Sequence, residues 1–99
     1  MNSEQIVFTM ILHAGDARSH ALEALRCARK GEFSKAEDLM GKAKAELIEA
    51  HHIQTELLQA ESRGEKQEVN LLLIHAQDHL MTAILAKDLI EEMILLYKK

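Results

Sequence analysis

The sequence contains no proline and no tryptophan, and its aromatic residues are two phenylalanines and one tyrosine. Proline is the strongest breaker of helices, and alanine, leucine, glutamate and lysine dominate what remains. This composition favours helices and gives no indication of a sheet. The 99 residues suffice for one small domain and leave no room for a second core.

Cysteine and basic residues are also scarce. Cys27 is the single cysteine, so no disulfide can form within the chain, and a reducing cytoplasmic environment is expected. The formal net charge is −4, whereas nucleic-acid binding normally leaves a basic surface. We therefore expect no nucleic-acid partner.

No long hydrophobic run is present near the start of the chain. The segment Met1–Gln5 carries no basic residue, and the apolar run from Ile6 to Leu12 is interrupted by Thr9. That run is too short to span a bilayer. We expect neither a signal peptide nor insertion into a membrane.

Two glycines divide the chain into three segments. Gly31 follows two cations that suit the end of a helix, and Gly64 marks a second break. Ser34 and Glu37 match a capping box, which predicts that a helix starts at Ser34. The single domain 1–99 is thus predicted to contain helices over residues 3–30, 35–62 and 66–97.

The first two predicted helices each carry one apolar stripe with a period of about 3.6 residues. In the first, the stripe contains Val7, Met10, Ala14, Ala17, Ala21, Leu25 and Ala28. In the second, it contains Ala36, Leu39, Ala43, Leu47, Ala50, Leu57 and Leu58. Gly15 and Gly41 lie inside these helices, where glycine is less favourable than alanine by about 1 kcal/mol. They indicate exposed positions or close helix approach, and Gly15 could also leave space for a large neighbour.

The segment 69–96 is the most apolar part of the chain, yet it contains His75 and Asp78. With residues spaced about 100° apart, it presents two apolar faces. The face centred on Asp78 contains Leu71, Ile74, Met81, Thr82, Leu85, Leu89 and Leu96. The opposite face contains Val69, Leu73, Ala76, Leu80, Ala83, Ile84 and Ile94. A three-helix bundle needs only one of them, so the other predicts packing against further copies of the chain.

The position of Asp78 within an apolar face narrows its chemistry. A buried carboxylate must find a partner or take up a proton. On a closed symmetry axis several Asp78 carboxylates would converge, and Mg²⁺ is the usual cation for a few carboxylates plus water. A solvated or capped Asp78 is the alternative.

His75 lies about 60° from Asp78, where both solvent and a neighbouring subunit can reach it. Histidine has an ordinary pKa near 6.5, so this imidazole is often neutral and nucleophilic. His79 lies one turn further on the same side of the helix. The remaining histidines are interpreted as surface or packing residues: His13, His20, His51 and His52. Arg18 is interpreted as a local partner of Asp16, with contact to phosphate as the alternative.

The motif His75–Met81, HAQDHLM, resembles the signature of the lactose/cellobiose-type IIA components, including those for N,N'-diacetylchitobiose, of the bacterial phosphoenolpyruvate-dependent sugar phosphotransferase system. Other stretches are similar to the same family: Gly15–Ser19, Gly31–Phe33, Glu49–His51 and the following Gln54–Thr55. The motif combines seven residues of mixed chemistry, so it is far more specific than a pair of spaced histidines.

This resemblance implies an antiparallel three-helix protomer that assembles as a homotrimer, a nine-helix bundle. It implies that His75 accepts a phosphoryl group on Nε2 from the phosphocarrier HPr and passes it to a cysteine of the cognate IIB component. The membrane component IIC would carry the sugar, a β-disaccharide of the cellobiose, lactose or chitobiose type. Asp78 would bind one Mg²⁺ together with its two symmetry copies. Gln77 and His79 would have supporting roles.

Two other functions remain as alternatives. One is a metal-binding bundle in which His75, Asp78 and His79 hold a transition metal within each protomer, although no convincing fourth ligand is present. The other is an oligomerising helical adaptor whose polar core residues set the register of the helices.

Overall fold

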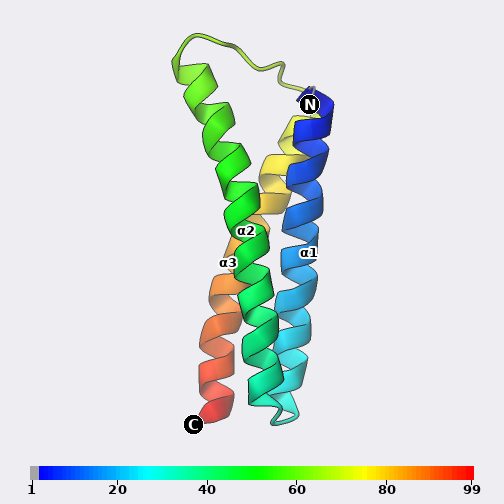
Figure 1. Cartoon of the computed structure of the whole chain (residues 1–99), viewed down its shortest axis with the longest axis vertical. Helices are drawn as coiled ribbons and strands as arrows, with labels where there is room; N and C mark the ends of the chain where they lie inside the picture. The colour runs from blue at the N-terminus through cyan, green and yellow to red at the C-terminus, as the bar shows by residue number, and fades with distance from the viewer. Residues whose placement is uncertain (1–2) are drawn as a thin grey trace.

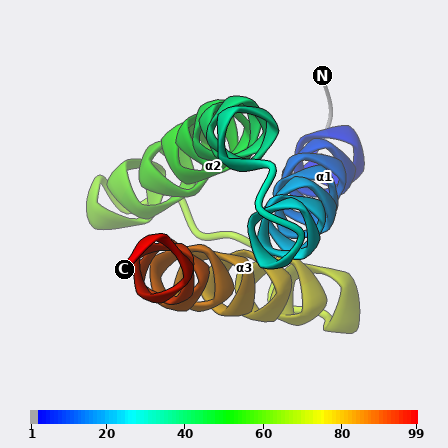
Figure 2. The ribbon, with the colours of Figure 1, turned by 90° about the horizontal axis from the view of Figure 1, so that it is seen from below.

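The chain folds into an elongated bundle of 50 × 20 × 19 Å in a computed structural model that describes residues 3–99. Its helices are α1 (Ser3–Arg29), α2 (Phe33–Ser62) and α3 (Leu71–Lys98). α1 and α3 run in the same direction, and α2 runs in the opposite one (Figure 1). Viewed along the bundle, the helices occupy the corners of a triangle (Figure 2). The predicted all-α, three-helix protomer is confirmed over this range.

The first two residues of the predicted domain, which also begin the segment Met1–Gln5, lie outside the described residues. Over residues 3–99, none of the helices has the length and apolarity that crossing a bilayer requires.

Both predicted glycine breaks are present, and each ends a helix in the same way. Gly31 has φ of 83°. Its amide donates to the carbonyl of Ala28 at 3.0 Å, and the amide of Glu32 donates to the carbonyl of Cys27 at 2.9 Å. This pair of bonds is the Schellman motif, which needs a left-handed residue. Gly64, with φ of 87°, ends α2 with the equivalent bonds.

The predicted capping box at the start of α2 is wrong. The helix begins at Phe33, its N-cap residue is Glu32, and no side chain caps it. The amide of Ala36 donates to the carbonyl of Glu32 at 3.0 Å, so Ser34 already lies within the first turn. Phe33 packs against the buried cluster at this end of the bundle. The partial burial of this aromatic ring favours the earlier start.

The third helix starts later than the predicted residue 66. Residues 65–70 are not helical, and α3 begins at Leu71. Asn70 has extended backbone angles, and its side chain accepts a hydrogen bond from the amide of Leu73 at 2.9 Å. Asparagine is a preferred N-cap, so this bond sets the start of the helix. Residues 63–70 thereby span the distance between the separated ends of α2 and α3 (Figure 1).

The buried seam of the bundle consists mainly of alanine. Among the described residues, the only large side chains with less than 2 % exposure are Met10 and Leu80. The buried alanines come from all three helices: Ala14, Ala17, Ala21, Ala24, Ala28, Ala36, Ala43, Ala50, Ala76 and Ala83. Small side chains let helix backbones approach closely, so the seam is thin and the three helices lie close to one another.

The two predicted faces of α3 have opposite environments. Of the inner face, Ala76, Leu80, Ala83 and Ile94 are buried, whereas Val69 precedes the helix and is exposed. Every large apolar residue predicted around Asp78 is between 50 and 81 % exposed: Leu71, Ile74, Met81, Leu85, Leu89 and Leu96. A single protomer therefore leaves the outer face of α3 uncovered, and Asp78 itself is exposed rather than buried.

Substitution by alanine should change the free energy of unfolding in opposite directions at two glycines of this fold. Gly31→Ala should lower the free energy of unfolding by about 1 kcal/mol, because a Cβ atom disfavours the left-handed backbone. Gly41→Ala should raise it by about 0.5–1 kcal/mol, because Gly41 lies inside α2 with open space around its Cβ position. Urea unfolding at one protein concentration measures both changes. Equal effects of the two substitutions would contradict the assigned helix end.

Candidate functional site

The candidate site lies on the first half of α3, where this helix runs beside α1 (Figures 1 and 2). The rings of His75 and His79, one turn apart on α3, are stacked with their centroids 5.5 Å apart and an interplanar angle of 20°. His75 is exposed, and His79 is partly buried. The structure therefore brings together the two predicted histidines and leaves the first one open to a partner molecule.

Gly15 of α1 makes room for His79. A Cβ atom at residue 15 would lie 3.2 Å from Nε2 of His79, closer than ordinary van der Waals contact. The missing side chain allows the imidazole of His79 to lie against the backbone of α1. Gly15 was predicted to leave space for a large neighbour, and that neighbour is His79.

The surroundings of His79 lower its pKa below the ordinary value of 6.5. Burial is the largest cause, followed by the positive charge of Arg18 and by His75, while Asp78 acts in the opposite direction. A lowered pKa keeps the imidazole of His79 neutral at neutral pH. The ring that supports His75 therefore adds no positive charge to the site.

Gln77 and Asp78 lie between the two histidines in the sequence and have different surroundings, since Gln77 is partly buried and Asp78 is exposed. The Oε1 atom of Gln77 accepts a hydrogen bond from Nε2 of Gln54 on α2 at 2.6 Å. Within residues 3–99, the carboxylate of Asp78 forms neither an ion pair nor a hydrogen bond. The neighbouring Thr82 hydroxyl donates to the carbonyl of Asp78 at 2.9 Å and so remains on its own helix.

Two further sequence interpretations need correction. Arg18 and Asp16 do not form an ion pair in the described chain, because residues two apart lie on different sides of a helix. A transition-metal site within each protomer is also not assembled. Over residues 3–99, no three histidine, cysteine, aspartate or glutamate side chains are placed to share one ion.

The other histidines have structural surroundings. Nδ1 of His13 on α1 is paired with the carboxylate of Glu46 on α2, and Nε2 of His52 lies 3.1 Å from Oε1 of Glu56. His20 is partly buried, and its Nδ1 atom has no hydrogen-bond partner in the described chain. The prediction that these are surface or packing residues agrees with these positions.

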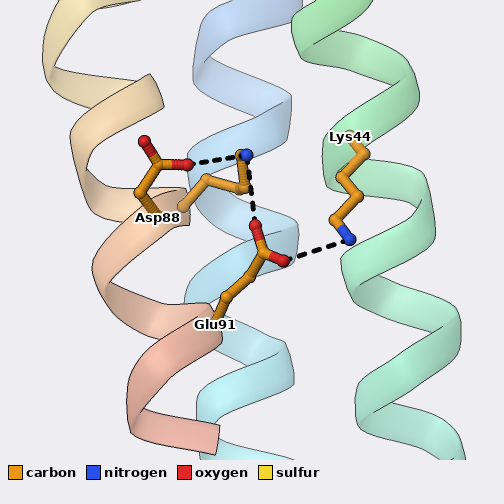
Figure 3. A network of polar contacts seen from close by, with 4 residues as sticks. Lys44, Asp88 and Glu91 are labelled. Atoms are coloured by element: carbon orange, nitrogen blue, oxygen red, sulfur yellow. Dashed lines mark ion pairs between the residues drawn. The ribbon is translucent and has the colours of Figure 1, made fainter.

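A separate charged network joins α2 and α3 further along the bundle (Figure 3). Nζ of Lys44 lies 3.1 Å from Glu91, which also pairs with Lys87 at 3.1 Å, and Lys87 lies 2.7 Å from Asp88. The hydrogen bond to Asp88 is the main reason that the pKa of Lys87 is raised. Burial alone would raise the pKa of Glu91, but the two lysines lower it below 4.5. This network stabilises helix packing and does not include the paired histidines.

A groove between α2 and α3 borders this network. The residues that line it are Lys44, Leu47, Ile48, His51, Ile84 and Lys87. The groove is mainly apolar, and neither His75 nor His79 contributes to it. Because His75 is exposed, the candidate site is a surface position, which suits a reaction between two proteins.

The model of the lactose/cellobiose-specific IIA subunit of the phosphotransferase system matches residues 5–98, nearly the whole chain. The chain belongs to this IIA family. The lichenan-specific phosphotransferase enzyme IIA component of Bacillus subtilis is 51 % identical over 96 residues, which are 97 % of this chain and 87 % of that protein. The family assigned from the motif His75–Met81 is therefore confirmed, and the chain is a phosphotransferase-system protein of sugar transport.

Two solved structures of IIA proteins have the same fold. The crystal structure of the cellobiose-specific enzyme IIA from Bacillus anthracis has a TM-score of 0.94 and 56 % sequence identity, covering 99 % of this chain and 91 % of that one. The solution structures of the IIA(chitobiose)–HPr complex from Escherichia coli include a chain with a TM-score of 0.86 and 41 % identity, covering 99 % and 95 %. The homotrimer predicted for this chain is consistent with the IIA fold.

Sequence reasoning located both histidines of this IIA-family chain but missed part of their surroundings. The contact between α1 and His79 was signalled by Gly15, which is unfavourable in a helix interior unless space is needed. The partner of Gln77 was not predicted, because Gln54 is on another helix and no spacing rule relates the two. Arg18 was assigned to the wrong neighbour.

The contact between Gly15 and His79 predicts a local effect of Gly15→Ala. The added Cβ atom should displace the His79 ring by a few tenths of an ångström and disturb its stacking on His75. NMR spectra of the histidine side chains should show shifted resonances for both rings and unchanged resonances for His52, which is exposed on α2 and paired with Glu56. Gly41→Ala is the matched control and should leave all three rings unchanged. Unaltered His79 resonances in Gly15→Ala would rule out this packing.

Proposed function

We propose that the chain is the phosphoryl carrier between HPr and a cognate IIB component. In this role His75 accepts a phosphoryl group from phospho-HPr and passes it to a cysteine of IIB, and IIC carries the sugar in the membrane. The observation that carries the proposal is the exposed imidazole of His75, stacked on a partly buried His79, within the family's motif. The IIA(chitobiose)–HPr complex of a relative adds support for HPr as the donor.

The transfer to His75 is an in-line displacement at phosphorus. The lone pair of Nε2 attacks, the bond between phosphorus and the donor nitrogen breaks, and its electrons return to that nitrogen. No general base is needed, because a neutral imidazole has a free lone pair. In the second step a thiolate of IIB attacks, the bond from His75 to phosphorus breaks, and neutral imidazole is regenerated.

The protein contributes position and electrostatics to this chemistry. Stacking on His79 restricts the orientation of the His75 ring, which favours an aligned attack. His79 is kept neutral, so it places no positive charge beside His75 that would withdraw electron density from the attacking ring. Transfer between two histidines retains the type of bond, so the first step is near thermoneutral and reversible.

We propose further that three protomers pack through the exposed face of α3. The large apolar residues around Asp78 are too exposed for a stable monomer surface, and covering them would bring three Asp78 carboxylates to one axis. Carboxylate oxygens suit Mg²⁺, so one ion shared by the three Asp78 side chains would neutralise their repulsion. The metal has no part in the transfer steps.

The sugar is proposed by class. The relatives described above are named for lichenan, cellobiose and chitobiose, which contain β-linked sugars. We infer that the sugar transported with this chain is a β-linked disaccharide of the same kind. Selection among such sugars is assigned to the membrane component.

The carrier role predicts a covalent product on His75. Incubation with phosphoenolpyruvate, enzyme I and HPr should add about 80 Da to the chain, and acid should remove this mass because the bond is a phosphoramidate. His75→Ala should abolish the adduct, whereas His52→Ala should retain it, since His52 is exposed and paired with Glu56. Intact-protein mass spectrometry makes the measurement. Absence of an adduct on the wild type would favour the adaptor hypothesis.

If Asp78 lies on the trimer axis, removal of its carboxylate should leave the trimer stable. Asp78→Leu should give a trimer with a thermal midpoint at least equal to that of the wild type, because apolar packing replaces three converging charges. Metal analysis should find one Mg²⁺ per three wild-type chains and none in Asp78→Leu or in Asp78→Asn, the control of similar shape. Sedimentation velocity measures assembly. Dissociation of Asp78→Leu into monomers would refute the axial position.

A further inference from the structure

Arg18 is a cation with no protein partner in the described part of the chain. It is exposed on α1, and it makes no ion pair with Asp16 or with any other carboxylate in residues 3–99. Arg26 on the same helix differs, because its guanidinium lies 3.2 Å from Glu23. Arg18 is therefore free to bind an anion from outside the chain.

The fold places Arg18 beside the paired histidines. Arg18 follows Gly15 by one turn of α1, so the two residues are neighbours on the same side of this helix. Gly15 is where α1 contacts the ring of His79, and His79 in turn stacks on His75. α1 and α3 run in parallel here (Figures 1 and 2).

The charges around the histidines change when His75 carries a phosphoryl group. Before transfer, no carboxylate of the described chain forms an ion pair with Arg18. A phosphoryl group brings negative charge and three acceptor oxygens. A guanidinium matches two of these oxygens with parallel N–H groups, which makes arginine well suited to phosphate.

We propose that Arg18 is a phosphoryl-binding residue, whose guanidinium donates hydrogen bonds to the phosphoryl oxygens on His75 during transfer and in the phosphohistidine. This inference rests on the proposed function of His75. Arg18 reaches the phosphoryl group from α1, while His79 orients the His75 ring from α3. The step remains a displacement at phosphorus, and no bond to Arg18 forms or breaks.

The kinetic test compares Arg18→Gln with Arg26→Gln, which removes an equal charge from the same helix. With phosphoenolpyruvate, enzyme I and HPr, Arg18→Gln should slow formation of the adduct by about 10- to 100-fold and shorten the lifetime of the phosphohistidine. Arg18→Lys keeps the charge without the planar fork and should be intermediate. Arg26→Gln should match the wild type. Circular dichroism checks that the variants retain their helices.

Two spectroscopic readouts separate this role from a structural one. In the unphosphorylated protein, the NMR resonances of the His79 ring should shift in Arg18→Gln and stay unchanged in Arg26→Gln. In the phosphorylated protein, the ³¹P resonance should differ between Arg18→Gln and the wild type. Unchanged His79 resonances in Arg18→Gln would show that Arg18 does not lie beside the histidines, and so would overturn the proposal.

The outcomes distinguish this inference from the carrier function on which it rests. If the wild type is phosphorylated on His75 but Arg18→Gln reacts at the same rate and shows the same ³¹P resonance, the role of Arg18 is wrong and the carrier function stands. If the wild type forms no adduct, both are wrong. If transfer is slower in Arg18→Gln but not in Arg26→Gln, and the ³¹P resonance of Arg18→Gln is changed, Arg18 is established as a ligand of the phosphoryl group.

Discussion

The close packing of three helices along a seam of alanines determines the surface of this molecule. Because Met10 and Leu80 are the only large side chains fully buried in the described chain, the seam occupies little width. Most leucines, isoleucines and methionines of α3 therefore remain outside it. The exposed apolar face around Asp78 is a direct consequence, and it is the physical reason for proposing that further copies of the chain cover it.

The same close approach positions the candidate site. α1 can lie near the first half of α3 because Gly15 has no side chain at the point where His79 meets it. His79 then supports the ring of His75 through stacking, and burial keeps its own pKa low. The ring of the exposed His75 is thus held by the imidazole of His79. The imidazole of His79 in turn lies against α1, at the other end of the sequence. Arg18 lies one turn beyond this contact on α1.

Many features of the fold could be predicted because they depend on local periodicity. The stripe on α1 and the inner face of α3 are buried largely as their spacing indicates, and Gly31 and Gly64 end helices because only glycine readily adopts a left-handed backbone. Helix starts were harder to predict. Ser34 and Glu37 had the residue types of a capping box, but α2 begins at Phe33, which is partly buried against the cluster at this end of the bundle.

The sequence by itself determined that this chain forms three helices, that α3 has two apolar faces, and that the motif His75–Met81 is that of a IIA protein. These properties follow from spacing and residue type within single segments. Only the tertiary structure decided that His79 lies against Gly15, that Gln77 bonds to Gln54, and that the side of α1 carrying Gly15 and Arg18 meets His79. Each depends on the relative positions of different helices, which are set by packing and not by the period of any one helix.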